Sequence, residues 1–221
     1  VSLWSAASVA VVDPERGAIE RTIAVGDHPC DLVESPDGSR LFVANANLNT
    51  VSVVDLALGR TRETLTTSID SRAPTGSTPN ALALDRDGRT LVVANADNNC
   101  LAVIDVARPW HSRPLGFLPV GWYPTAVQIE PASGAIVVAN GKGTGSSPTN
   151  LAPPDTGDFC RYLSYRLHDR GALSILAPPG PRELASGSRR VLANMPAPAG
   201  GKLRPPRGSP IPATPGRPPP I

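Results

Sequence analysis

The side chains best suited to bind a ligand lie in two sets of loops that recur along the chain. One set comes just before a proline that opens a short apolar run, and the other follows an Asn that closes the next run. Aromatic, amide and charged groups in such loops can stack on a ligand and exchange hydrogen bonds with it. The candidate ligand-binding residues are His28, Asn47, Asn80, Asp97, Trp122, Tyr123 and Lys142.

Each candidate also has a structural interpretation. An Asn after a strand more often closes a turn through its own side chain than binds a ligand. Trp122 and Tyr123 would equally well cap a hydrophobic interface, because burying one such ring is worth roughly 1.5–3 kcal/mol. His28 has no partner at metal-ligand spacing, and the NGKGTG stretch that starts at Asn140 lacks the GxxxxGK[ST] pattern of a phosphate-binding loop.

Three acidic residues raise the question of a metal site. Glu34 lies five residues after its proline, at the position that the apolar Leu84 and Ile129 occupy in the later repeats. Asp85 and Glu130 each fall one position further on. Because alternate residues of a strand point to opposite faces, Glu34 should face away from the other two. The sequence therefore predicts no metal ligands and no cofactor.

The loops belong to a repeated unit. The strings FVAN, VVAN and VVAN end at Asn45, Asn95 and Asn140, at spacings of 50 and 45 residues, and a proline stands sixteen residues before each Asn. Apolar, β-branched runs that end at Asp55 and Asp105 follow the first two copies. Each unit is predicted to contain four short strands, because turn signals separate its apolar runs.

Turn residues divide the strands of each unit. The Asp-Gly pairs at 37–38 and 87–88 predict type I′ hairpins, which need positive φ at both central positions. The segments 13–17 and 55–59 share an Asp-to-Gly spacing, which predicts turns capped by Asp with Gly in the left-handed conformation. A repeated four-stranded unit of 40–50 residues is typical of a β-propeller blade.

The predicted fold class is all-β: a partial, open β-propeller of four-stranded antiparallel blades, with one short C-terminal helix and a Pro-rich tail. Residues 1–176 would form about three blades and a partial blade, 177–196 a linker helix, and 197–221 a basic, disordered linker. The strand after each proline is expected to be the innermost. Three such strands cannot close a ring of four to eight blades, so we expect exposed apolar faces and self-association.

Composition changes at the same boundary. Residues 1–176 carry fourteen basic and eighteen acidic residues, whereas 177–221 carry seven and one. Prolines dilute the basic residues of the tail and no aromatics interleave with them, so no nucleic-acid partner is predicted. No apolar run reaches the about 20 residues that span a bilayer. Cys30, Cys100 and Cys160 stand far apart without a CxxC pair, which predicts small buried thiols.

The repeats resemble the YVTN repeat of bacterial β-propellers. The matching stretches are residues 25–55, 76–105 and 120–143, which combine V-G-x-x-P, S-P-D-G, F-V-A-N and V-V-D patterns. GWYPTAV, VANGKG and the segment PRELASGSRRVLANM (181–195) are similar to a narrower subgroup, in which such a propeller precedes an alkaline-phosphatase-superfamily phosphoesterase domain. The resemblance implies a periplasmic or extracellular protein whose partner is that downstream domain. None of the phosphoesterase's metal or nucleophile residues has a match here.

Two functions follow as expectations. In the first, the chain is a non-catalytic scaffold or recognition segment that binds an unknown ligand or protein on its rim. In the second, it is a lactonase-like, metal-dependent hydrolase. Lactonase-type propellers hold a divalent cation in the channel with carboxylates and amides, a role that would fall to Glu34, Asp85 and Glu130.

Overall fold

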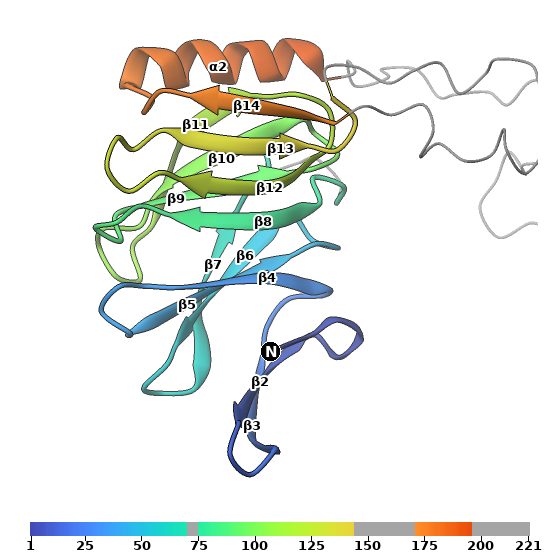
Figure 1. Ribbon diagram of the computed structural model, residues 1–221, viewed down its shortest axis with the longest axis vertical. Helices are drawn as coiled ribbons and strands as arrows, with labels where there is room; N and C mark the ends of the chain where they lie inside the picture. The colour runs from blue at the N-terminus through green and yellow to red at the C-terminus, as the bar shows by residue number, and fades with distance from the viewer. Residues whose placement is uncertain (70–74, 144–170, 196–221) are drawn as a thin grey trace, which may run out of the picture.

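The computed structural model describes residues 1–69, 75–143 and 171–195, and antiparallel sheets follow one another through it (Figure 1). The first sheet contains β1 (Ser2–Leu3), β2 (Ser8–Asp13) and β3 (Ala18–Ala24), with the 3₁₀ turn η1 (Trp4–Ala6) between its first two strands. The second sheet contains β4 (Pro29–Glu34), β5 (Arg40–Asn45), β6 (Thr50–Asp55) and β7 (Arg60–Thr66).

The next two sheets repeat this plan. The third contains β8 (Pro79–Leu84), β9 (Thr90–Asn95), β10 (Cys100–Asp105) and β11 (Arg113–Pro119). The fourth contains β12 (Pro124–Ile129), β13 (Ile136–Asn140) and β14 (Ala172–Leu176). Within each sheet the strands lie in sequence order, and β12, β8 and β4 lie side by side (Figure 1). The predicted fold class is confirmed: the chain is a partial, open β-propeller.

Every innermost strand begins at its proline with the same irregularity. Pro29 pairs with Asn45, but the next pair joins Asp31 to Ala44, so Cys30 is an extra, bulged residue. The same skip occurs at the start of β8 and of β12. A bulge bends a strand and redirects its side chains, and here it does so at one end of each innermost strand.

The hairpins between the first and second strands of a blade differ from the prediction. Gly38 and Gly88 have φ of +69° and +67°, but neither preceding Asp has a positive φ, so the type I′ prediction is wrong. The Gly38 N–H instead donates to the Ser35 carbonyl oxygen at 2.9 Å. The loop between β4 and β5 holds five residues rather than two, and such loops are built around a type I turn that leaves only the Gly left-handed.

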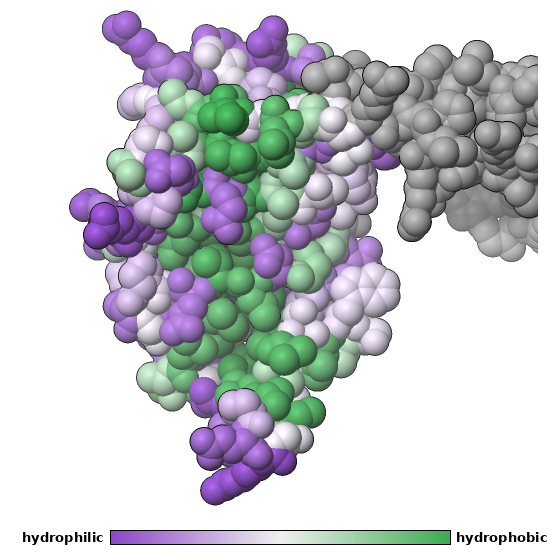
Figure 2. All heavy atoms as spheres, in the orientation of Figure 1, coloured by the Kyte–Doolittle hydropathy of each residue, from purple (hydrophilic) through white to green (hydrophobic). Residues whose placement is uncertain are grey.

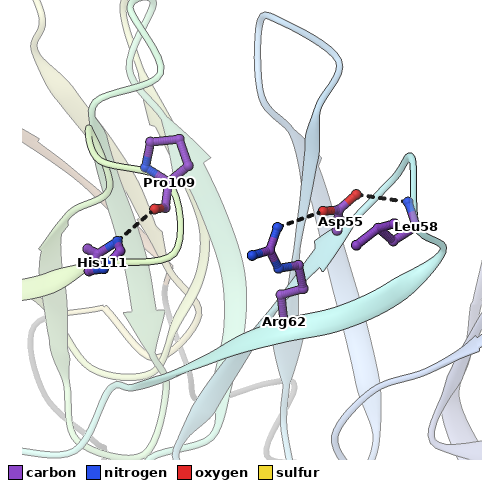
Figure 3. Close-up of polar contacts among 5 residues, drawn as sticks. All are labelled: Asp55, Leu58, Arg62, Pro109 and His111. Carbon is purple, nitrogen blue, oxygen red and sulfur yellow. Dashed lines mark hydrogen bonds and ion pairs between the residues drawn. The ribbon is translucent and has the colours of Figure 1, made fainter.

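The turns between the third and fourth strands are confirmed as predicted. Asp55 Oδ1 accepts a hydrogen bond from the Leu58 N–H at 2.9 Å, and Gly59 has φ of +63° (Figure 3). The other oxygen, Asp55 Oδ2, lies 3.1 Å from Arg62 Nη1. The Leu58 N–H contributes most to holding the pKa of Asp55 below its usual value, because it stabilises the ionised carboxylate.

The hydrophobic core lies between the blades. Buried side chains of β5 and β6, such as Phe42 and Val53, belong to one cluster with Leu91 and Ile104 of the third blade. A second cluster joins the opposite face of the third blade to the fourth blade, where Val127 is buried. The middle blades therefore bury both faces, which explains why β5, β6, β9 and β10 are continuous apolar runs in place of alternating patterns.

The C-terminal helix α2 (Pro181–Asn194) is confirmed and packs on β11. Leu184 and Val191 are buried, whereas Leu192 is exposed. The backbone approaches closely here, because a Cβ on Gly187 would lie 2.4 Å from the Phe117 carbonyl oxygen. The structure describes three strands in the fourth sheet, where the second and third sheets have four. No helix among the described residues is long and apolar enough to cross a membrane.

The fourth sheet leaves hydrophobic side chains exposed, and we expect the chain to self-associate through them. Leu173 and Ile175 of β14 are 71% and 73% exposed, and Figure 2 shows hydrophobic residues in a band down this side. Light scattering on residues 1–221 should detect oligomers, and replacing both side chains by Ser should reduce them. Leu58→Ser, at an exposed turn position, is the control. A monodisperse monomer of the unmodified chain would contradict this expectation.

Gly88→Val should destabilise the fold more than Gly17→Val. Both glycines are left-handed, with φ of +67° and +61°, which costs a β-branched residue about 1–3 kcal/mol. A Cβ at Gly88 would also lie 2.8 Å from Pro36 Cδ of the neighbouring blade, whereas one at Gly17 meets nothing within 4 Å. Unfolding of both variants by denaturant gives the loss in the free energy of unfolding for each. Equal losses would show that the close approach to Pro36 does not affect stability.

Candidate functional site

The two predicted sets of loops meet at one rim of the propeller. Asn47, Asp97 and Lys142 occupy the same position in successive repeats, and each contacts the loop that precedes the innermost strand of its own blade. The chemistry differs from blade to blade: Asn47 Nδ2 donates to Asp27 Oδ2 at 2.6 Å, Thr78 Oγ1 donates to Asp97 Oδ2, and Lys142 Nζ lies 4.8 Å from the Tyr123 ring centroid.

The backbone beneath these contacts is the same each time. His28, Thr78 and Tyr123 are left-handed, with φ of +55°, +49° and +56°, and each stands directly before the proline of an innermost strand. Their carbonyl oxygens accept the N–H groups of Ala46, Ala96 and Gly141 at 2.9, 3.0 and 2.8 Å. Proline disfavours the right-handed helical region for the residue before it. Because the left-handed conformation recurs in all three repeats, it is a property of the repeat and not of one side chain. The repeat thus holds three different side chains in the same backbone conformation.

Sequence reasoning missed two amides that join neighbouring blades at this rim. Asn49 Oδ1 accepts the N–H groups of Gly76 and Ser77 in the next blade at 2.9 and 2.8 Å. Asn99, at the same place in the following repeat, accepts the Tyr123 N–H at 2.8 Å. Their common position four residues after the repeated Asn was a usable signal, but the partners lie 24 to 28 residues away in sequence.

The repeated Asn residues are structural. Asn45, Asn95 and Asn140 are buried, and Asn45 Nδ2 donates to Thr50 Oγ1 and Ser52 Oγ at 3.0 Å each. A Cβ on Gly26 would lie 2.4 Å from Asn45 Cγ. The glycine of the V-G pair therefore makes room for the amide that ties the second strand of the blade to the third.

The remaining candidates are spread around the rim. His28 Nδ1 lies 2.9 Å from Asp27 Oδ1, and its ring meets the Trp4 ring edge-on at 3.9 Å between centroids. The Asn47 amide is the main cause that lowers the pKa of Asp27, and His28 adds to it. Asn80 is a bulged residue of β8 whose buried Oδ1 has no hydrogen-bond partner among the described residues. Asp27 lies in a predicted rim loop but was not itself a predicted candidate, and neither was Trp4.

The acidic residues considered for a metal site lie at the opposite ends of the innermost strands and are used locally. Glu130 Oε2 accepts the Ser133 N–H at 2.6 Å, and Asp85 Oδ1 accepts the Arg89 N–H at 2.6 Å. The Ser133 hydroxyl is the main cause that lowers the pKa of Glu130. In the described ranges, no three His, Cys, Asp or Glu side chains are grouped to hold a metal ion.

The two described thiols, Cys30 and Cys100, are poor nucleophiles. Cys100 is buried as predicted, and burial raises its pKa to about 12. Cys30, the bulged residue at the start of β4, is exposed, so the prediction of a buried thiol is wrong there, although its Sγ lies 3.4 Å from the Pro79 carbonyl oxygen of the next blade. Partial desolvation still raises the pKa of Cys30 to about 11, which keeps it protonated at neutral pH. Cys160 lies outside the described residues.

Comparison with known proteins identifies the family. The family described as "Lactonase, 7-bladed beta-propeller" matches residues 6–116, from the first blade into β11. The chain belongs to this lactonase family. Among solved structures, hydrazine synthase of Kuenenia stuttgartiensis aligns with a TM-score of 0.53 and 26% identity, over 62% of this chain. This lactonase-family segment spans 37% of that protein's chain. A search of curated proteins found no significant match.

Asn49→Ala should destabilise this lactonase-family propeller by about 1–3 kcal/mol, because the buried N–H of Ser77 and the part-buried N–H of Gly76 in the next blade lose their acceptor. Asn47→Ala, in the same loop but exposed, is the control and should cost less than about 0.5 kcal/mol. Chemical denaturation followed by circular dichroism gives both values. Equal effects would mean that the contact between blades contributes nothing.

Proposed function

We propose that this lactonase-family segment is a non-catalytic scaffold and recognition module that binds a ligand or protein on the rim. The observation that carries the proposal is the combination of a constant backbone with variable side chains. Three repeats hold the residue before the proline in one left-handed pose, yet present His28, Thr78 and Tyr123 there. A repeated frame that displays different polar and aromatic groups suits selective binding.

The alternative, a lactonase-like metal-dependent hydrolase, has less support from these residues. Such chemistry needs metal ligands that converge on one point. Asp85 and Glu130 each accept hydrogen bonds from their own hairpins, and Glu34 Oε1 lies next to Gly38 of its own turn. The family includes lactonases by name, so the alternative stays the second candidate.

The wider architecture is part of the same proposal. Residues 1–176 would form the propeller segment, 177–196 a linker helix and 197–221 a basic linker that leads to a phosphoesterase domain in the full-length protein. The similarity of residues 181–195 to the linker of YVTN propeller–phosphoesterase proteins supports this order, and α2 occupies that segment. We further propose a periplasmic or extracellular location, no nucleic-acid partner and no resident cofactor.

Assays of hydrolysis test the proposal. The 221-residue chain should not hydrolyse γ-butyrolactone or an acyl-homoserine lactone with or without Ca²⁺, nor p-nitrophenyl phosphate with Mg²⁺ or Zn²⁺. Calcium should not raise the thermal midpoint beyond the effect of matched ionic strength.

Lactone turnover that Glu34→Gln abolishes would overturn the proposal in favour of the hydrolase. Glu15→Gln, at an exposed turn of the first blade, is the matched control and should leave any such turnover intact.

A further inference from the structure

A cavity of about 470 Å³ opens between the rim loops of the third and fourth blades and the C-terminal end of α2. Its wall combines Trp122, the consecutive Asp97, Asn98 and Asn99, and Asn194 of the helix. The volume falls within the range of about 300–1,000 Å³ that is usual for small-molecule sites. Two of the rim candidates, Asp97 and Trp122, thus line one cavity, while His28, Asn47 and Asn80 do not.

Hydrogen bonds made by two of the lining amides determine which of their polar atoms remain available. The Oδ1 atom of Asn99 accepts the Tyr123 N–H at 2.8 Å, so its Nδ2 group is left as a donor. The Nδ2 group of Asn98 donates to Ser77 Oγ at 2.9 Å, so its Oδ1 atom is left as an acceptor. Neither remaining atom bonds to another described residue, and the two amides together offer one oriented donor and one oriented acceptor.

The charge and shape of the wall restrict the ligand further. Among the described residues that line the cavity, Asp97 is the only charged one, so no described cation there compensates a phosphate or carboxylate group. Trp122 is 43% exposed and supplies a flat aromatic surface, with Val120 and the buried Val191 close by. Aromatic rings bury apolar surface at little cost in conformational freedom, and planar amides and carboxylates pair with vicinal hydroxyl groups that both donate and accept.

We propose that this cavity binds a neutral saccharide, with the C–H face of one sugar ring on Trp122 and its hydroxyl groups on Asp97, Asn98 and Asn99. The inference rests on the proposed recognition function and assigns it a ligand class. The hydroxyl groups of an uncharged sugar can accept from the Asn99 amide and donate to the Asn98 oxygen. They can also donate to the Asp97 carboxylate, and the sugar brings no negative charge that the carboxylate would repel.

Tryptophan fluorescence and calorimetry on the full 221-residue chain test the proposal. The probes are maltotriose, cellotriose and triacetylchitotriose, with inorganic phosphate and glucuronate as charged comparisons. At least one neutral trisaccharide should bind and shift the emission, and the charged compounds should bind at least tenfold more weakly. Trp122→Ala should abolish the fluorescence change and weaken binding at least tenfold. The matched control is Trp4→Ala, which removes an exposed tryptophan of the first blade that does not line the cavity and should leave binding unchanged.

A second variant guards against a folding defect in the first. Asp97→Asn, at an exposed position, keeps an oxygen that can accept the Thr78 hydroxyl but removes the carboxylate, and calorimetry should show binding weakened at least tenfold while circular dichroism stays native. The proposal is overturned if no neutral saccharide binds, if a charged compound binds as tightly, or if Trp122→Ala and Asp97→Asn bind like the unmodified chain. Loss of saccharide binding without lactone turnover would leave the recognition function standing, whereas turnover abolished by Glu34→Gln would remove that function itself.

Discussion

The structure depends on one constraint: a blade of this propeller has two apolar faces, and neither can be covered from within the blade. Strands such as β5 and β9 are hydrophobic on both sides, so their stability comes from the neighbouring blades. Stacking positions everything else. It places the loops before the innermost strands next to those between the second and third strands, and it leaves the outermost face with Leu173 and Ile175 in solvent.

The contacts across the blade interfaces show how the polar rim adds to this packing. The Asn49 amide accepts two N–H groups of the following blade, and the Asp31 carboxylate accepts the Leu82 N–H of the adjacent innermost strand at 2.7 Å. Backbone donors at a strand edge would otherwise go unpaired. The same side chains that close the edges thus set the rim in place, which is why its loops keep their shape while the outward-facing residues differ.

Much of the fold could be predicted because its signals are local. Each proline and the Asn sixteen residues later mark the start of the first strand and the end of the second, and the pattern of 181–194 marked the helix. The turn type was missed because loop length, rather than the Asp-Gly pair, decides whether Asp37 must become left-handed. The interblade role of Asn49, the exposure of Cys30 and the pairing of Trp4 with His28 depend on neighbours that spacing within one unit does not specify.

The close approach of Gly88 to Pro36 has a geometric consequence for the assembly as a whole. Because Gly88 has no side chain, Pro36 of the second blade can lie close to the third blade at one end of their interface, while Asn49 bonds across the other end. These two features together restrict the angle between the two sheets. In a closed ring of such blades, that angle would determine how many blades fit into a full turn, so a methyl group added at position 88 would change the angle and with it the size of the ring.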